Sequence, residues 1–352
     1  MRPAGLSTWL RAWRSVLIGA GLVVVAGCPV HAGPPQDVLG AAGPQAAHIQ
    51  SLWHLTVWTC TLVFAGILAA VLVVLWRSPR ADASASPDLS VRERPERGAK
   101  RSVGAAITAS VLLLLFLIAA SVLTDRALAH LSLKDAVHVQ VTANQWWWEA
   151  RYDGAEASDV FTTANELHIP AGRPVIFTLK SNDVIHSLWV PNLHGKKDLI
   201  PGRTATLQLQ ADRPGVYRGQ CAEFCGYQHA YMAFRVVAEP PERYAAWERH
   251  QREPAPEPSD PVKKRGQALF MGTSCAMCHA IGGTDAAARH GPDLTHLAGR
   301  ATLAAGTLDN TPDNLKQWIR NPQRFKPGAN MPASNLSDEE LDAIVAYLGS
   351  LS

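Results

Sequence analysis

The 352-residue sequence lacks any run in which Lys and Arg are dense and aromatic residues are interleaved, and its formal net charge is only +3. Proteins that bind nucleic acid normally carry such a basic run, so nucleic acid is not indicated as a partner. Cysteine is also scarce, with six residues. Four of these form two short-range pairs, a spacing typical of cofactor ligands or attachment points rather than of a disulfide framework. The length favours two or three domains.

The chain begins with the layout of an export signal. Three arginines precede an apolar run at residues 16–25, which leads into Val-Ala-Gly-Cys28. This ending resembles the cleavage box of a bacterial lipoprotein, with Cys28 as the lipidated residue; ordinary cleavage after Ala32 is the alternative. We therefore predict a signal peptide at residues 1–28, followed by a leader without Lys or Arg up to residue 52.

Two uncharged stretches follow, at residues 55–76 and 102–124. Each is long enough to cross a hydrocarbon core of about 30 Å as a helix. The segment between them is rich in Lys and Arg, and the positive-inside rule assigns such a segment to the cytoplasm. The sequence therefore predicts that residues 29–134 form the leader and a two-helix transmembrane hairpin with both ends outside. A buried helix pair in a soluble protein is the less favoured alternative.

Residues 135–238 show the pattern of β structure. Apolar and polar residues alternate at 137–144 and 205–210, a period of two that indicates half-buried strands. Pro-Gly and Pro-Ala-Gly turns punctuate the region, and a last strand is expected at residues 233–238. Short strands with regular turns favour a sandwich or a barrel.

Residues 239–261 are rich in Pro and in charged residues, so we predict a semi-rigid, partly extended linker there. Residues 262–352 then form a second soluble unit. A helix is expected at 262–271, and Ser337 begins a last helix with a capping box. The apolar face of that last helix comprises Leu341, Ile344, Val345 and Leu348.

A cluster of sulfur and imidazole side chains lies in the β region. Cys221, Cys225, His229 and Met232 are close together in the sequence, and His186 lies upstream. Thiolate, imidazole and thioether ligands suit copper better than magnesium or calcium. Two thiolates at this spacing can bridge two copper ions, with one histidine for each. A disulfide and a zinc site are the alternatives, but a disulfide leaves the histidines unexplained and zinc rarely recruits methionine.

The spacing of these ligands, His186 followed by Cys-x-Glu-x-Cys-x3-His-x2-Met, resembles the binuclear copper A site of cytochrome c oxidase subunit II. The resemblance covers residues 45–240 and implies an all-β, cupredoxin-like Greek-key sandwich. It implies that the side chain of Glu223 reaches a magnesium ion at the junction with subunit I, and that Asp183 and Asp198 lie at the interface or docking surface. The implied copper ligands are the bridging Cys221 and Cys225, the terminal His186 and His229, the weak ligand Met232 and the backbone carbonyl of Glu223.

The same resemblance gives a role to three consecutive tryptophans. Trp146 corresponds to the tryptophan through which electrons enter copper A. If the segment is a strand, Trp147 points to the face opposite Trp146 and Trp148, where its loss would mainly reduce stability. A domain tethered by the 239–261 linker has a high effective concentration, on the order of mM for short flexible linkers. We therefore expect it to dock repeatedly near Trp146, without tight binding.

The second unit contains Cys275, Cys278 and His279 in a Cys-x-x-Cys-His motif, through which c-type haem is attached covalently. A zinc or redox pair is the alternative for such a motif. The order of the helix, this motif, Gly-Pro-Asp-Leu and Asn-Met331-Pro resembles a class I cytochrome c domain. That resemblance implies an all-α fold and Met331 as the sixth haem ligand, since a Met/His pair raises the haem potential. The rival ligands are Met271, Met277, His290 and His296.

A subunit II domain fused to a cytochrome c domain resembles subunit II of a caa3-type haem–copper oxidase. The resemblance implies the electron-input subunit of a bacterial, proton-translocating cytochrome c oxidase. Electrons would pass from cytochrome c through the chain's own haem c and copper A to haem a and copper B of subunit I, which reduces O2 to water. The implied partners are subunits I and III and a cytochrome c or another respiratory donor. The implied location is the inner membrane, with the copper A and haem c domains on the periplasmic side.

The sequence departs from the family at its second apolar stretch, which begins without the usual carboxylate; Glu96 is the nearest upstream acid. The carboxylate at the mouth of the proton path is therefore not assigned. Two other functions stay open, a copper A subunit of a nitric oxide reductase and a stand-alone membrane-tethered electron carrier. A tether needs only one span, which argues against the second. The sequence identifies neither the catalytic partner nor the electron donor.

Overall fold

The structure is a computed structural model that describes residues 36–78, 96–129, 134–154, 156 and 159–352. These residues belong to one of the two units into which the chain divides, Pro35–Ser352. The predicted signal peptide, Cys28 and part of the basic segment between the apolar stretches lie outside the described residues, so those predictions stay predictions.

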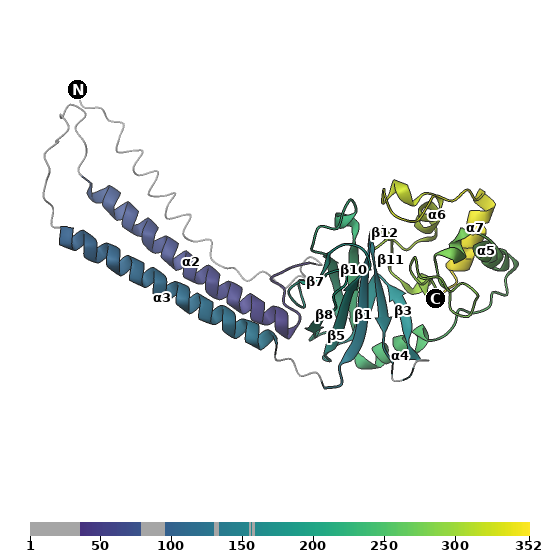
Figure 1. The fold of residues 1–352 in the computed structure, drawn as a ribbon, viewed down its shortest axis with the longest axis horizontal. Helices are drawn as coiled ribbons and strands as arrows, with labels where there is room; N and C mark the ends of the chain where they lie inside the picture. Colours follow the sequence, from purple (N-terminus) through teal and green to yellow (C-terminus); the bar gives the residue numbers. More distant parts are fainter. Residues whose placement is uncertain (1–35, 79–95, 130–133, 155, 157–158) are drawn as a thin grey trace, which may run out of the picture. The chain divides into compact units, whose positions relative to one another are not determined.

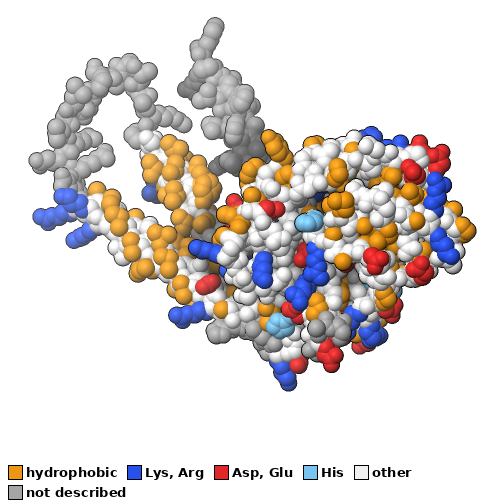
Figure 2. Space-filling view, turned by 45° about the vertical axis from the view of Figure 1, so that its right-hand side comes forward, with side chains coloured by type: hydrophobic (Ala, Val, Ile, Leu, Met, Phe, Trp, Pro, Cys, Tyr) orange, Lys and Arg blue, Asp and Glu red, His pale blue; other side chains and the backbone are white. Residues whose placement is uncertain are grey.

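Two long helices, α2 (Pro44–Arg77) and α3 (Glu96–Leu128), contain the two predicted spans and lie side by side (Figure 1). Both are long and apolar enough to cross a membrane, judged by length and composition. Their apolar side chains are exposed (Figure 2), an arrangement that suits lipid better than water. Helix α2 begins before the predicted span because its first turn packs on the β region, where the Ala46 N–H donates to the Leu193 carbonyl over 3.2 Å.

The β region is a sandwich of two five-stranded sheets, with strand orders β3-β2-β1-β5-β8 and β4-β10-β9-β6-β7. Strand β1 pairs with β5 in parallel, as β10 does with β4, and the other neighbours are antiparallel. The chain crosses repeatedly from one sheet to the other, as the predicted Greek-key sandwich requires. The strands are β1 (Val137–Asn144), β2 (Trp147–Tyr152), β3 (Phe161–Ala164), β4 (Glu166–Pro170), β5 (Val175–Ser181), β6 (His186–Trp189), β7 (Lys197–Leu199), β8 (Ala205–Leu209), β9 (Gly215–Cys221) and β10 (Ala233–Glu239).

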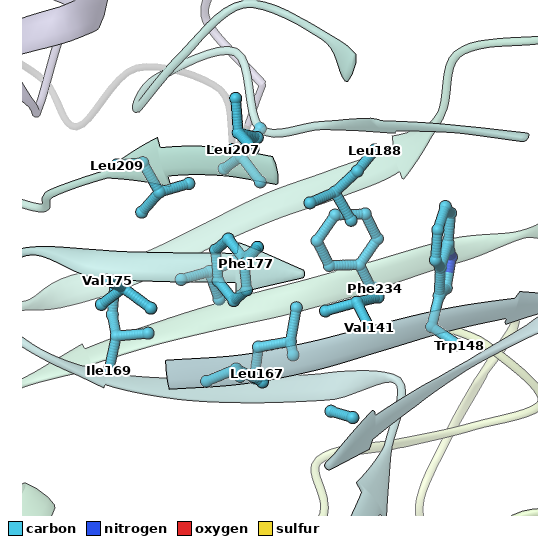
Figure 3. Packing of buried hydrophobic residues seen from close by; sticks show 14 of the residues in the cluster. Val141, Trp148, Leu167, Ile169, Val175, Phe177, Leu188, Leu207, Leu209 and Phe234 are labelled. Carbon is cyan, nitrogen blue, oxygen red and sulfur yellow. The ribbon is translucent and has the colours of Figure 1, made fainter. Parts of the chain in front are cut away.

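The core of the sandwich lies between the two sheets (Figure 3). Phe177 from one sheet and Phe234 from the other are fully buried. The predicted alternation is confirmed in the first half of β1, where Val137, Val139 and Val141 are buried and His138 is exposed. This packing fixes one end of the sandwich, where β6 begins and β9 ends, as a rigid support for the candidate site.

The segment predicted as an extended linker contains a helix, so that prediction is wrong for residues 241–251. Helix α4 (Pro241–Gln251) starts with a proline in its first turn, where the missing N–H costs nothing. Its Tyr244 is buried, and Trp247 packs against Tyr152 and His168 of the sandwich. Two aromatic residues on one face therefore outweigh the Pro-rich composition, which keeps only the remaining part of the segment irregular.

The C-terminal unit is mainly helical and has its own hydrophobic core. The last helix has the predicted capping box, formed by Ser337 and Glu340, and Leu341, Ile344 and Leu348 are buried as predicted. A two-stranded hairpin, β11 and β12, was not predicted. The elements are α5 (Pro261–Gly272), η4 (Ser274–Met277), η5 (Leu297–Gly299), β11 (Thr302–Leu303), β12 (Leu308–Asp309), α6 (Pro312–Arg320), η6 (Pro322–Arg324) and α7 (Asp338–Leu348).

Candidate functional site

Cys221 and Cys225 lie together at one end of the sandwich, and both are buried. Cys221 is the last residue of β9, and Cys225 is in the loop that follows. Their Sγ atoms are 3.7 Å apart and both cysteines are free. A disulfide bond needs about 2.05 Å between the sulfur atoms, so the structure contradicts the disulfide alternative.

The other predicted side-chain ligands converge on these two sulfurs. His186, the first residue of β6, places Nδ1 3.7 Å from the Cys221 sulfur. His229 places Nδ1 3.6 Å from the Cys225 sulfur, and the Met232 sulfur lies 3.9 Å from the same atom. Strand pairing brings the remote histidine in, because β6 and β9 are neighbours with Leu188 opposite Cys221.

Glu223 faces the cluster with its backbone and not with its side chain. Its carbonyl oxygen lies 3.2 Å from the Cys221 sulfur. Its carboxylate is exposed and lies 4.0 Å from Lys196 Nζ. The side chain is therefore free for a partner outside the ligand set.

Asp183 orients His186, a role that the sequence analysis missed when it assigned Asp183 to a docking surface. Its carboxylate accepts a hydrogen bond from His186 Nε2 at 2.7 Å, which leaves Nδ1 facing Cys221. It also accepts from the backbone N–H of Gln145 at 2.6 Å. Burial alone would raise the pKa of Asp183, but the hydrogen bonds from His186 and the backbone outweigh it and lower the pKa. The signal was the three-residue spacing from His186.

The two cysteines share their protons unequally. The hydrogen bond from the Cys225 thiol lowers the pKa of Cys221 to about 3, and the same contact raises the pKa of Cys225. This environment favours the thiolate form of Cys221, which is the form of cysteine that binds metal. Cysteine and histidine together, with a thioether beside them, form a soft donor set that suits copper.

The three tryptophans contact two different sites, and Trp146 contacts both. Trp146 lies in the turn between β1 and β2 and not on a strand, but its indole N–H donates to the Cys225 carbonyl at 2.9 Å. The Trp148 indole N–H donates to the Met232 carbonyl at 3.4 Å. Trp147 is half-buried and lines a cavity in the C-terminal unit together with Trp146. Trp147 therefore borders a second site, whereas the sequence analysis expected it to serve mainly for packing.

That cavity has a volume of about 430 Å³. It is lined by all four predicted haem-binding residues, Cys275, Cys278, His279 and Met331. Its size is in the range of cofactor sites in proteins. The Nδ1 of His279 hydrogen-bonds to the Pro292 carbonyl at 2.7 Å, which leaves Nε2 as a ligand. Burial lowers the pKa of His279, and so favours the neutral, ligating form.

Gly291 permits this arrangement of the histidine. A Cβ at this position would stand 2.6 Å from the His279 ring, closer than side chains tolerate. The glycine in the Gly-Pro sequence is therefore required by the close approach of the backbone to the imidazole.

The rival haem ligands are not equally placed. Met277 is 70 % exposed on the attachment loop, and Met271 packs against the hydrophobic core. His296 is buried, but its two ring nitrogens lie 3.2 and 3.1 Å from the Ser352 and Glu253 carbonyls. His290 is exposed at the rim of the cavity. Met331 is thus the methionine that both lines the cavity and lies outside the attachment loop and helix α5.

Arg300 provides independent evidence of the kind of ligand that the cavity can bind. Its side chain lines the cavity, and its Nε is buried without a hydrogen-bond partner in the described part of the chain. An unpaired buried donor is costly unless a ligand satisfies it. A carboxylate is the natural partner of a guanidinium, and haem carries two propionates, so the donors of the cavity fit haem. No motif in the sequence predicted a role for Arg300.

Comparisons with known proteins agree with both sites. The family described as cytochrome c oxidase subunit II, periplasmic domain, matches residues 154–239, and the cytochrome c family matches residues 263–352. A protein of Alkalihalophilus pseudofirmus named cytochrome c oxidase subunit 2 is 42 % identical to this chain, and the match covers 62 % of each chain. A protein of the same name from Bacillus sp. strain PS3 is 36 % identical, with 68 % of this chain and 71 % of the relative covered. The relative in Bacillus subtilis is 32 % identical, with 68 % of this chain and 72 % of the relative covered.

The first family implies a copper A site and the second implies haem c. The description of the subunit II family as a periplasmic domain also implies an extracytoplasmic location for residues 154–239. The two apolar helices suggest a membrane anchor for the domains that follow them.

Proposed function

The chain belongs to the cytochrome c oxidase subunit II family, and from this membership we propose that it is the electron-input subunit of a caa3-type haem–copper terminal oxidase. One observation carries the proposal. A soft donor cluster and a cavity lined by the Cys-x-x-Cys-His motif lie in one chain, and Trp146 contacts both. Haem c and copper A supply the one-electron chemistry when they are bound.

Copper A would be held by the six donors that converge at the end of the sandwich. Cys221 and Cys225 would bridge the two ions, and each histidine would serve one ion. What supports this is the pairing of donors, since His186 faces Cys221 and His229 faces Cys225. A rigid sandwich behind the loop limits rearrangement when the charge changes. The full set of proposed donors is Cys221, Cys225, His186, His229, Met232 and the carbonyl of Glu223.

Haem c would be attached through Cys275 and Cys278 and ligated by His279 and Met331. The hydrogen bond from His279 Nδ1 to Pro292 supports the assignment, because it fixes the ring with Nε2 free. Arg300 would pair with a propionate. These residues bind and orient the group and exclude water from it.

Trp146 is proposed as the residue through which electrons reach the copper site. Its indole N–H bonds to the carbonyl of a copper ligand, Cys225, at 2.9 Å, while its side chain also lines the haem cavity. Among the described residues whose side chains bond to the copper loop, Trp146 is the one that the sequence analysis assigned to electron entry. The contact supports a short, bonded connection between the two sites.

The partners follow from the function. We propose subunit I with haem a and copper B, subunit III, and a cytochrome c or another respiratory donor, in the bacterial inner membrane with both soluble domains on the periplasmic side. The exposed carboxylate of Glu223, next to Lys196, is available for a magnesium ion at the junction with subunit I. The matched region spans 62 % of the length of the first relative and 71–72 % of the next two, so whole-complex activity belongs to the proposal.

The domain organisation is proposed in the same terms. It comprises a signal peptide (1–28), a leader and two spans (29–134), a copper A domain (135–238), a connecting segment (239–261) and a cytochrome c domain (262–352). The end of β10 at Glu239 and the start of α5 at Pro261 support the two boundaries of the connecting segment, each within one residue.

Isolation of the intact membrane complex tests the function directly. Co-purification with a haem a subunit and O2 consumption driven by reduced cytochrome c are expected. A catalytic subunit that reduces nitric oxide would instead identify a nitric oxide reductase, and a chain isolated alone from gentle detergent would favour a free electron carrier. The Cys221→Ser variant of the complex should lose the copper A electron paramagnetic resonance signal, since a hydroxyl does not replace a bridging thiolate.

A further inference from the structure

The cytochrome c unit contacts the copper loop and Trp146 through residues 326–328, which lie shortly before Met331. Gln228, inside the copper loop, donates to the Pro327 carbonyl at 2.8 Å. Gly328 has a φ of +87°, and a Cβ there would stand 3.6 Å from Cη2 of Trp146. The segment thus runs alongside the Trp146 ring with no side chain between them.

Lys326 begins this segment and is nearly inaccessible, with 3 % of its surface exposed. Its Nζ donates to the Trp146 carbonyl at 2.7 Å and to the Ala304 carbonyl at 3.2 Å. The first acceptor belongs to the sandwich and the second to the cytochrome c unit. One side-chain amino group therefore ties the two domains together at the tryptophan.

The burial of this lysine needs a reason, because burying an amine costs free energy unless its N–H groups are paired. Burial lowers the pKa of Lys326 to about 7. In the described residues its hydrogen bonds go to two carbonyls and not to a carboxylate. An apolar side chain would fill the same space at less cost but would leave the Trp146 carbonyl without its donor.

We propose that Lys326 is a positioning residue that latches the cytochrome c domain onto the turn carrying Trp146, and so holds the haem cavity, the indole and the copper loop in one continuous arrangement. The inference deepens the proposed function and rests on it for its purpose, electron passage from the haem side to the copper side. It replaces the expectation of loose, repeated docking with a specific docked state, in which a backbone carbonyl of the entry residue is the docking point.

Two other contacts give a readout that is independent of electron transfer. The Ala233 N–H of the sandwich donates to the Ala305 carbonyl of the cytochrome c unit at 3.1 Å, and the Ala301 N–H donates to a Glu166 carboxylate oxygen at 3.2 Å. Both amides are shielded by the partner domain only while the domains are docked. Their hydrogen exchange therefore measures docking.

The test compares Lys326→Met with wild type, using the full chain loaded with copper and haem. We expect peptides containing Ala233 and Ala301 to exchange roughly tenfold faster in the variant, equivalent to about 1.4 kcal/mol. Haem-to-copper transfer after flash reduction should slow by a similar factor, while the copper resonance and the haem spectrum stay unchanged. Lys326→Arg, which keeps donors to the carbonyls, should restore part of both losses.

The matched control is Lys264→Met, the same substitution at an exposed lysine of α5, which should behave as wild type. Unchanged exchange and unchanged transfer in Lys326→Met would overturn the latch. Faster exchange throughout the domain core, or altered copper and haem spectra, would also overturn it by showing a merely structural role. If wild type itself transfers no electrons from haem to copper, the proposed function fails, and the exchange data still decide whether Lys326 latches the domains.

Discussion

The indole N–H of Trp146 donates a hydrogen bond to the carbonyl of Cys225, a proposed copper ligand, over 2.9 Å. The same indole packs beside Gly226, where an added Cβ would stand 3.1 Å from Cζ2. The ring is therefore fixed against the copper loop by a bond and by contact. Residues that are held in this way by the scaffold keep one geometry during function.

Trp146→Phe should separate the effect of the indole hydrogen bond on electron transfer from the effect of the aromatic ring. The variant keeps an aromatic ring in place but loses the N–H, so we expect haem-to-copper transfer to slow by roughly tenfold, about 1.4 kcal/mol in barrier. Copper content and the haem spectrum should not change. Flash-induced reduction of the copper site measures the rate, and Trp247→Phe, on the far helix α4, is the control. Equal rates in wild type and variant would remove Trp146 from the route.

Trp147→Ala should change the haem and not only the stability of the fold. Trp147 is half-buried and lines the haem cavity, so its removal admits water to that side. The apolar shell of a metal site controls its potential by limiting water. We therefore expect a lower haem potential in the variant with the copper resonance unchanged, measured by a spectroscopic redox titration. A lower melting temperature with an unchanged potential would restore the simple packing role.

Asp183→Asn should weaken the copper site without touching a ligand. The carboxylate fixes His186 through a 2.7 Å hydrogen bond to Nε2. Loss of such an outer-shell partner typically costs roughly 10–100-fold in metal affinity. A copper competition titration measures the effect. The control is Asp198→Asn, on the exposed strand β7, which should bind copper as wild type does. Equal affinities in the two variants would show that Asp183 does not support His186.

Met331→Ala should remove the sixth haem ligand. The variant is expected to lose the methionine-to-iron band at the red end of the oxidised spectrum and to show a lower potential, because a Met/His pair raises it. The covalent attachment through the two cysteines should remain. Met277→Ala is the control, since Met277 is 70 % exposed. Survival of the band in Met331→Ala would mean that another residue ligates the iron.

The sequence predicted which side chains would come together at the end of the sandwich, because their identities and spacing carry chemical information by themselves. Cys221, Cys225 and His229 lie within one short loop, and the distant His186 was found by its family spacing. Contacts made across the fold carry no such local signal. Lys326 and Arg300 look like ordinary basic residues in the sequence. Only the folded chain shows that Lys326 is buried and that the buried Nε of Arg300 lies at the haem cavity.

The elements show the same division. Alternation in β1 and the capping box at Ser337 are local patterns, and both predictions are confirmed. The helix α4 was missed because its stability comes from tertiary packing of Tyr244 and Trp247, while its local composition favours an irregular linker. The position of Trp146 in a turn was missed since three tryptophans in succession fit a strand equally well.

A buried ionic cluster links the sandwich to α4 and to the cytochrome c unit. His168 of β4 lies 3.3 Å from a Glu166 oxygen and 3.2 Å from a Glu239 oxygen, and its ring stacks on Trp247 with centroids 4.2 Å apart. Burial alone would lower the pKa of His168, but the hydrogen bonds to both carboxylates outweigh it and raise the pKa. Arg243 faces Glu239 at 4.0 Å. Burial alone would raise the pKa of Glu166, but the hydrogen bond and charge of His168 outweigh it and lower the pKa, with a smaller contribution from the charge of Arg300.

The cluster predicts a pH-dependent stability of the sandwich. A histidine whose pKa is higher in the folded state stabilises the fold fully below its unfolded pKa, near 6.5, and that contribution is lost as the pH rises through the folded value. The melting temperature of the full chain should therefore fall as the pH is raised above about 6.5, because His168 then loses its charge between two carboxylates. His168→Gln should be less stable at pH 6 and should show a flatter dependence on pH. His138→Gln, at an exposed position of β1, is the control and should keep the wild-type slope. Thermal unfolding followed by tryptophan fluorescence at a series of pH values measures both slopes, and parallel curves for wild type and His168→Gln would show that another group sets the pH dependence.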